Sequence, residues 1–175
     1  TWRARRREIA ADIATATARA EAVRLAKRVE ALDSELAANH ANMKALIESS
    51  KAAPLLEKAG IGPLTAAVVY AAWSHPGRVR NEAAFASLAG VSPIPASSGN
   101  TSRHRLNRGG DRRLNRTLHM ATVTRMVHDA ETRAYAEKRR AEGLTNREIR
   151  RCLKRYLARQ LYRTLNALHV EHAVA

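Results

Sequence analysis

Two adjacent serines, Ser97 and Ser98, precede Gly99 in a part of the chain that is rich in cations. When a serine hydroxyl attacks a phosphodiester, negative charge develops on the phosphoryl oxygens, and nearby guanidinium groups stabilise that charge. The arginines that follow the serine pair at short range are Arg103, Arg105, Arg108, Arg112 and Arg113. Phosphate chemistry is therefore the reaction class that this segment favours, and the first three of these arginines are the nearest catalytic candidates.

A long loop is expected to hold these residues, and we call it the serine loop. Residues 90–111 contain clustered Gly, Pro and Ser and no hydrophobic period, and long loops in compact domains are either functional or disordered. A serine hydroxyl needs a base or a metal ion to become a strong nucleophile, and His104 and Asp111 are the only obvious candidates near the pair. In the alternative, structural interpretation the serines only form a turn and bond to their own backbone.

The composition predicts a polyanion as the partner. The formal net charge is +15 and the pI is about 11.2, and 18 of the 31 basic residues fall in residues 99–175. The basic segments lack the Trp and Phe that anchor helices at membrane surfaces, so no membrane association is expected. Cys152 is the single cysteine, which excludes internal disulfides and favours a reducing, cytoplasmic location. We expect it to be a small core or boundary residue.

Residues 1–50 are predicted to form a coiled-coil arm. Between Arg5 and Ser50 there is no Gly or Pro, and apolar residues recur at alternating spacings of four and three. A helix of this length would extend roughly 65 Å, too far to be covered by one small domain. Asn39 either occupies the seam, where a buried amide can fix the register, or is exposed at a frayed seam. The arm either pairs with a second copy or folds against its own domain.

A glycine-rich hairpin is expected over residues 54–73. Gly60 and Gly62 surround a turn, and Pro63 starts the following helix, which fits the usual order of Gly after one helix and Pro at the start of the next. In a helix-hairpin-helix element such glycines let backbone N–H groups approach a phosphate, and Thr65 would add a hydroxyl. The alternative is an αα-hairpin that only packs.

Capping residues divide the rest of the compact domain, residues 51–175, into helices. Asn81 is expected to cap a short helix with a core Phe, and Asp111 to cap a helix that continues to about Glu142. The predicted fold class is therefore all-α, with a long N-terminal coiled-coil helix followed by a compact helical domain.

The last helix is predicted over residues 146–170, because Thr145 and Glu148 match a capping box. Cations recur along this helix at helical spacing, which suits a surface that follows phosphates without reading sequence. In the alternative, the cations form a solvated face paired with acids from neighbouring helices. The residues concerned are Arg147, Arg151, Lys154, Arg155, Arg159 and Arg163.

Three segments taken together resemble the C-terminal transposase domain of the IS110 and IS1111 group of insertion-sequence transposases. They are AGIGPLTAAVVYAAW, NEAAFASLAGVSPIPASSGN and RLNRGGDRRLNRTLHMA, in that order, within residues 54–168. The resemblance implies DNA transposition and recombination through a serine nucleophile that precedes a glycine, here Ser98, with Ser97 as the alternative because the pair leaves the alignment open by one residue. It also implies DNA and a guide RNA from the element as partners, and a dimer or tetramer in the bacterial nucleoid.

Such transposases also carry an N-terminal RuvC-like domain with metal-binding carboxylates, and no segment here fits it. The chain begins at Thr1 without Met, so we expect the C-terminal part of a longer protein. No cofactor is expected in this chain, and Mg²⁺ only on the RuvC-like domain. The active site would then be composite, and this chain alone would bind nucleic acid without cutting it.

Rival interpretations remain from the sequence alone. A two-metal site would need three carboxylates, and Asp111, Asp129 and Glu131 form the nearest cluster, although the last two would lie on different faces of one helix. His169 and His172 have metal-ligand spacing but no apparent third ligand, so no metal site is expected. From another class comes a non-catalytic helical module that binds DNA or RNA and dimerises.

Overall fold

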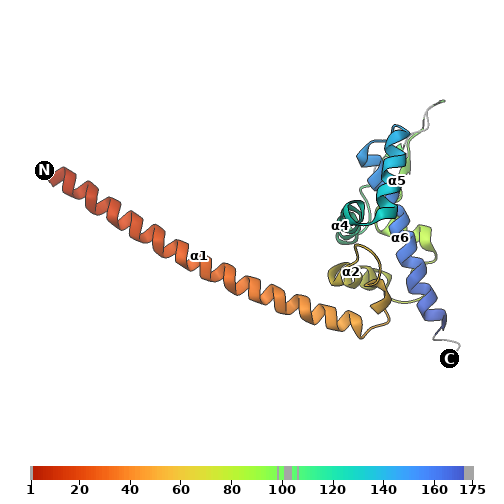
Figure 1. Ribbon diagram of the computed structural model, residues 1–175, viewed down its shortest axis with the longest axis horizontal. Helices are drawn as coiled ribbons and strands as arrows, with labels where there is room; N and C mark the ends of the chain where they lie inside the picture. The colour runs from red at the N-terminus through yellow and green to blue at the C-terminus, as the bar shows by residue number, and fades with distance from the viewer. Residues whose placement is uncertain (1, 98, 101–103, 106, 172–175) are drawn as a thin grey trace. The chain divides into compact units, whose positions relative to one another are not determined.

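The computed structural model describes residues 2–97, 99–100, 104–105 and 107–171 (Figure 1). Helices dominate this part of the chain, which confirms the all-α prediction. The elements are α1 (Trp2–Glu48), a 3-10 helix η1 (Ala53–Leu55), α2 (Pro63–Trp73), α3 (Glu82–Leu88), β1 (Ile94–Pro95), β2 (His104–Arg105), α4 (Arg112–His128), α5 (Ala130–Ala141) and α6 (Asn146–Glu171). In the described residues no helix is both long and apolar enough to span a bilayer.

The chain divides into two units, Thr1–Asn42 and Met43–Ala175. The described part of the first unit is one continuous helix, the N-terminal portion of the 47-residue α1. Its exposed large apolar side chains range from 38% exposed at Leu32 to 71% at Trp2 within this chain. This helix therefore carries a row of apolar side chains that its own unit does not cover.

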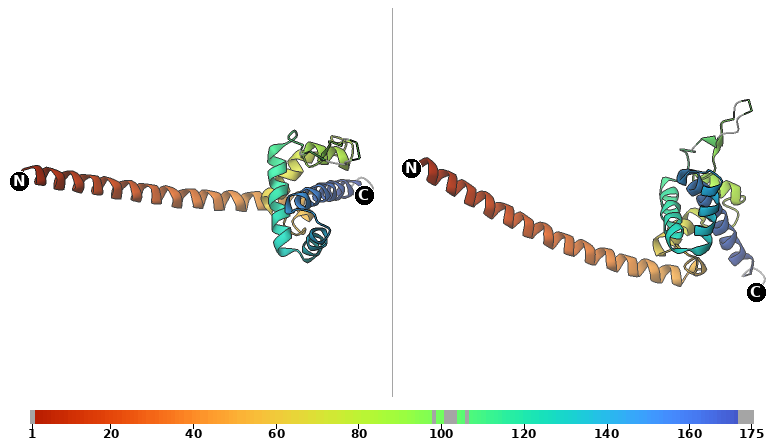
Figure 2. Two further views of the ribbon diagram at one scale, coloured as in Figure 1. Left: turned by 90° about the horizontal axis from the view of Figure 1, so that it is seen from above. Right: turned by 45° about the horizontal axis from the view of Figure 1, so that its top comes forward.

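The second unit is built around α6, which contacts α2, α3, α4 and α5. Figure 2 (left) shows α4 crossing α6. Leu118 of α4 and Leu161 of α6 are fully buried together with Trp73 and Phe85. The indole N–H of Trp73 donates a hydrogen bond to Asn166 Oδ1 at 2.9 Å, so this buried polar group is satisfied. The helical core thus fixes α6 relative to the segments on either side of the serine loop.

The predicted caps are confirmed. The side chain of Asn81 accepts a hydrogen bond from the N–H of Ala84 at 2.9 Å, and Asp111 accepts from two N–H groups in the first turn of α4. At the start of α6, Glu148 Oε2 accepts from the N–H of Thr145 at 2.8 Å, as a capping box requires. Local hydrogen bonds therefore set the residues at which α3, α4 and α6 begin.

The prediction of one helix from Asp111 to about Glu142 is wrong. Asp129 has a ψ angle of 119°, which ends α4, and its carboxylate accepts hydrogen bonds from the N–H and hydroxyl of Thr132 at the start of α5. These bonds lower the pKa of Asp129 from its ordinary value. One residue thus separates two helices.

The serine loop is not wholly irregular, because β1 and β2 form a short antiparallel ribbon inside it. Ile94 pairs with Arg105 and Pro95 pairs with His104. The ribbon reaches beyond the helices (Figure 2, right). In the glycine hairpin, the element before the turn is the 3-10 helix η1 rather than an α-helix.

Candidate nucleic-acid interface at the serine loop

The two ends of the serine loop meet at a neck made of glycines. The N–H of Asp111 donates to the carbonyl of Leu88 at 2.7 Å, which joins the end of α3 to the start of α4. Gly90 and Gly110 have φ angles of +63° and +91°, and an added Cβ on either would lie 2.5 Å from a backbone carbonyl oxygen. The neck therefore closes only with glycine at these two positions.

Asn115 holds this neck from α4. Its side-chain N–H₂ donates to the carbonyls of Ala89 at 2.8 Å and Gly90 at 3.1 Å, and its Oδ1 accepts from Lys154 Nζ of α6 at 3.2 Å. Burial lowers the pKa of Lys154, and the positive charges of Arg151 and Arg150 lower it further. Sequence reasoning did not find Asn115, although an amide one turn after an Asp cap was the available signal.

The predicted residues of the loop are described only in part. Ser98 and Arg103 lie outside the described residues. Ser97 is exposed, and so are Arg105 on β2 and Arg108. Arg112 and Arg113 are likewise exposed, in the first turn of α4.

Cations of the serine loop and cations of α6 converge on one surface. A cleft brings Arg105 together with Arg151 and Lys154, and its other lining residues are Gly90, Val91, Ser92, Pro93 and Asn107. A larger cavity of about 670 Å³ adjoins the cleft. It is lined by Pro93, His104, Leu144, Glu148, Arg151, Cys152 and Arg155. Of the predicted contact residues, this surface unites one from the serine loop with three from α6.

The remaining part of the α6 row lies elsewhere and is paired. Arg159 Nε donates to Glu82 Oε1 at 2.7 Å, and Arg163 Nε lies 3.1 Å from Glu82 Oε2. These pairs match the alternative in which acids from neighbouring helices neutralise the positive charge of the α6 cations. Arg147 is exposed at the start of α6. The row therefore divides into a paired C-terminal portion and a portion that faces the serine loop.

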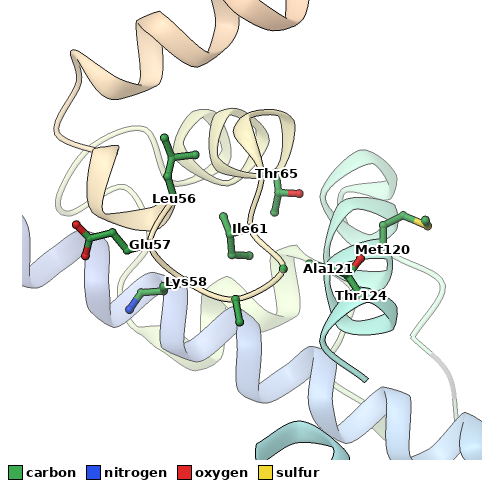
Figure 3. A pocket seen from close by; sticks show the side chains of 11 residues that line it. Leu56, Glu57, Lys58, Ile61, Thr65, Met120, Ala121 and Thr124 are labelled. Atoms are coloured by element: carbon green, nitrogen blue, oxygen red, sulfur yellow. The ribbon is translucent and has the colours of Figure 1, made fainter. Parts of the chain in front are cut away.

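The glycine hairpin lines a separate cavity of about 540 Å³, with Thr65 of α2 and Met120 of α4 among its lining residues (Figure 3). Gly60 packs tightly on α4, because an added Cβ would lie 2.8 Å from the carbonyl oxygen of Ala121. Gly62 is exposed, and an added Cβ would meet nothing within 4 Å. The first glycine thus has a packing role, whereas the second leaves the start of α2 accessible.

The acidic residues considered for a metal site have structural roles instead. Asp111 and Asp129 both cap helices, and in the described part of the chain no three His, Cys, Asp or Glu side chains group as metal ligands. These residues do not fit a Mg²⁺ site. His172 lies outside the described residues. Cys152 is half-buried on α6. Burial of the Tyr135 hydroxyl, together with the nearby Cys152 and Tyr156 side chains, raises the pKa of Tyr135 to about 12.

Comparison with known proteins shows which family the chain belongs to. Residues 52–137 match the family model described as Transposase IS116/IS110/IS902 family. The chain belongs to the IS116/IS110/IS902 transposase family. The matched region of this transposase family contains the hairpin, the serine loop, the neck glycines and Asn115, whereas α6 follows it.

Three insertion-element proteins are similar in sequence to this chain, in agreement with the family match. The chain is 34% identical over 125 residues to the IS110 43.6 kDa protein of Streptomyces coelicolor, covering 70% of this chain and 31% of that protein. It is 32% identical over 159 residues to the IS900 42 kDa protein of Mycobacterium paratuberculosis, covering 86% and 38%. A third relative is the IS116 44.8 kDa protein of Streptomyces clavuligerus, at 29% identity over 122 residues. The chain thus spans about a third of the length of these transposase-family relatives.

Proposed function

We propose that this chain is the part of an IS110-type transposase that binds DNA and carries the serine nucleophile. The observation that carries the proposal is the convergence of serine-loop and α6 cations on one cleft, where Arg105, Arg151 and Lys154 meet. Such a cluster attracts a polyanion and aligns a phosphate beside the ribbon whose strands flank the serines in the sequence. The family relationship identifies the polyanion as DNA.

In the proposed reaction the hydroxyl of Ser98, or of Ser97, attacks a DNA phosphodiester. The serine oxygen bonds to phosphorus, the bond from phosphorus to a sugar oxygen breaks, and the sugar oxygen leaves as a hydroxyl. The resulting phosphoserine ester conserves the bond energy for rejoining strands. Arg103, Arg105 and Arg108 stabilise the charge that develops on the phosphoryl oxygens.

The proton of the serine hydroxyl passes to a base outside this chain. Oδ1 of Asp111 is occupied as a helix cap, and the relatives, at 43.6 and 42 kDa, are more than twice as large as this chain of 19.3 kDa. A RuvC-like domain, which the family resemblance implies, would supply the base and complete a composite site. The isolated chain then binds DNA without cutting it.

Further contacts to nucleic acid are assigned by exposure. Arg112 and Arg113 are exposed directly after the serine loop, Arg147 is exposed at the start of α6, and all three bind phosphates of DNA or of a guide RNA. At the hairpin, Gly62 and Thr65 leave the start of α2 open to a second phosphate. Arg159 contributes less, because Glu82 already compensates its charge.

The arm is proposed to join copies of the protein. Its apolar side chains are exposed in the single chain, and pairing with the same row of a second copy would remove them from water. Asn39 is exposed here as well, and in a pair it would restrict the register. The protein would then assemble as a dimer through one pair of arms, or as a tetramer through two pairs.

Two measurements test the proposed function. In a duplex-binding titration, Arg151→Ala with Arg155→Ala is expected to weaken affinity and flatten its salt dependence by about two units of slope. Arg133→Ala on the exposed face of α5 is the matched control and leaves both unchanged. An affinity that does not vary with salt would refute DNA binding through this surface.

The second measurement is a search for a denaturation-resistant DNA adduct with the longer transposase. The adduct is expected to disappear in Ser98→Ala and to persist in Ser97→Ala, or the reverse if Ser97 reacts. If neither variant alters the adduct, the serine mechanism is refuted. If DNA binds but no adduct forms at all, the chain is a non-catalytic binding and dimerisation module.

A further inference from the structure

The cavity beside the serine loop is larger and less uniform than a phosphate contact requires. It encloses about 670 Å³ between β2 and α6, which falls in the range of pockets that hold whole small molecules. Pro93 and Leu144 give it apolar walls, and Glu148 adds a carboxylate. A site built only for phosphate would not place an acid and apolar surface in its lining, so its occupant has both apolar and hydrogen-bonding parts.

Apart from Cys152, the remaining lining groups are planar and cationic or aromatic. His104 of β2 faces the same cavity as Arg151 and Arg155 of α6. Nucleobases that are not paired stack on imidazole rings and guanidinium planes, with a contribution that tolerates any sequence. A base inside a duplex cannot use such a site, because its faces are covered by its neighbours. The lining therefore favours a base that has left the stack.

The cations around the small cleft next to the cavity suit the phosphate of the same nucleotide, which would lie on their surface. The cleft and the cavity share Pro93 and Arg151, and the cleft adds Arg105 and Lys154. The hydrogen bond from Lys154 Nζ to Asn115 fixes this cation at the neck of the serine loop. Glu148 Oε2 accepts from the N–H and hydroxyl of Thr145 at the start of α6, so Oε1 remains to accept a hydrogen bond from an exocyclic amino group of a base. Cations together with an acceptor match the phosphate and the base of a nucleotide.

We propose that the cavity between β2 and α6 binds one unpaired DNA nucleotide, with the base against His104 and Leu144 and its phosphate toward Arg105 and Lys154. This inference rests on the proposed function, since it names the form of DNA that the same surface recognises. It places an opened, rather than fully paired, stretch of DNA beside the ribbon whose two strands flank the serine pair in the sequence.

The test uses the 175-residue chain and two duplexes that differ by one extra, unpaired 2-aminopurine. The chain is expected to bind the bulged duplex about tenfold more tightly than the paired one, given the energy of one base stacked on a side chain. The 2-aminopurine fluorescence should change on binding. His104→Ala, at an exposed position, should remove the preference while keeping the affinity for the paired duplex.

His128→Ala, which removes an exposed histidine at the end of α4, is the matched control and should keep the full preference. Equal affinity for both duplexes without a fluorescence change would overturn the inference and leave the proposed function intact. A preference for a bulged RNA with none for bulged DNA would also overturn it as stated. Failure to bind every DNA at low salt would instead refute the proposed function.

Discussion

Replacing Gly110 with alanine should open the neck of the serine loop. At its φ angle of +91° a side chain is strained, which costs about 1–2 kcal/mol. An added Cβ would also lie 2.5 Å from the carbonyl oxygen of Leu88 and 2.8 Å from the N–H nitrogen of Gly90. Both atoms belong to the backbone, so the clash can be relieved only by moving α3 and α4 apart.

The clash adds to the backbone strain because relieving it breaks hydrogen bonds. The bond from Asp111 to Leu88 and the two bonds that Asn115 donates lie directly at the neck, and each contributes about 1 kcal/mol. We therefore expect Gly110→Ala to lower the free energy of unfolding of the second unit by about 3–5 kcal/mol, the strain included.

Gly143→Ala provides a matched comparison. Its φ angle of +87° is almost the same, but an added Cβ would meet nothing within 4 Å, so only the strain of about 1–2 kcal/mol applies. Urea unfolding followed by the fluorescence of buried Trp73, in a Trp2→Phe background, measures both variants on the second unit. Equal losses of stability in the two variants would refute the close approach at the neck.

Three further predictions concern side chains at the neck, at the start of α3 and between α4 and α5. Asn115→Ala should destabilise the second unit by about 2 kcal/mol and make the serine loop a faster site of limited proteolysis; unchanged cleavage would show that the amide does not hold the loop. Glu82→Gln frees two guanidinium groups and should tighten DNA binding at low salt and steepen the salt slope by about 1–2 units, whereas the exposed control Glu137→Gln should do neither. The pKa of Asp129 is lower in the folded chain, so its stabilisation is present above the unfolded value of about 3.9 and is lost as the pH falls through the folded value. Thr132→Val removes the hydroxyl bond, and the acid-unfolding midpoint measured by circular dichroism should therefore move to higher pH.

Local chemistry made much of the fold predictable. The caps at Asn81, Asp111 and Thr145 each depend on a side chain and an N–H group within three residues. Such bonds leave a signature in the sequence whatever the tertiary structure is. The break at Asp129 was missed although it has the same signature, because the helical period of apolar residues continues across it.

Contacts between distant segments could not be predicted. Glu82 and Arg159 are separated by 77 residues, and nothing in the spacing of the arginines indicates which of them an acid on α3 will compensate. The cavity joins Pro93 and His104 to α6 in the same way, through packing of elements that the sequence does not order in space. The family resemblance named the serine pair but not the groups of α6 that face its loop.

The neck affects how the proteins of related insertion elements can diversify. Because Gly90 and Gly110 hold the exit of α3 against the entrance of α4, residues between them contribute little to the spacing of the two helices. Insertions or deletions beyond the ribbon should therefore change the reach of the tip while the scaffold stays the same. Selection can in this way alter how far the tip extends without a penalty in folding.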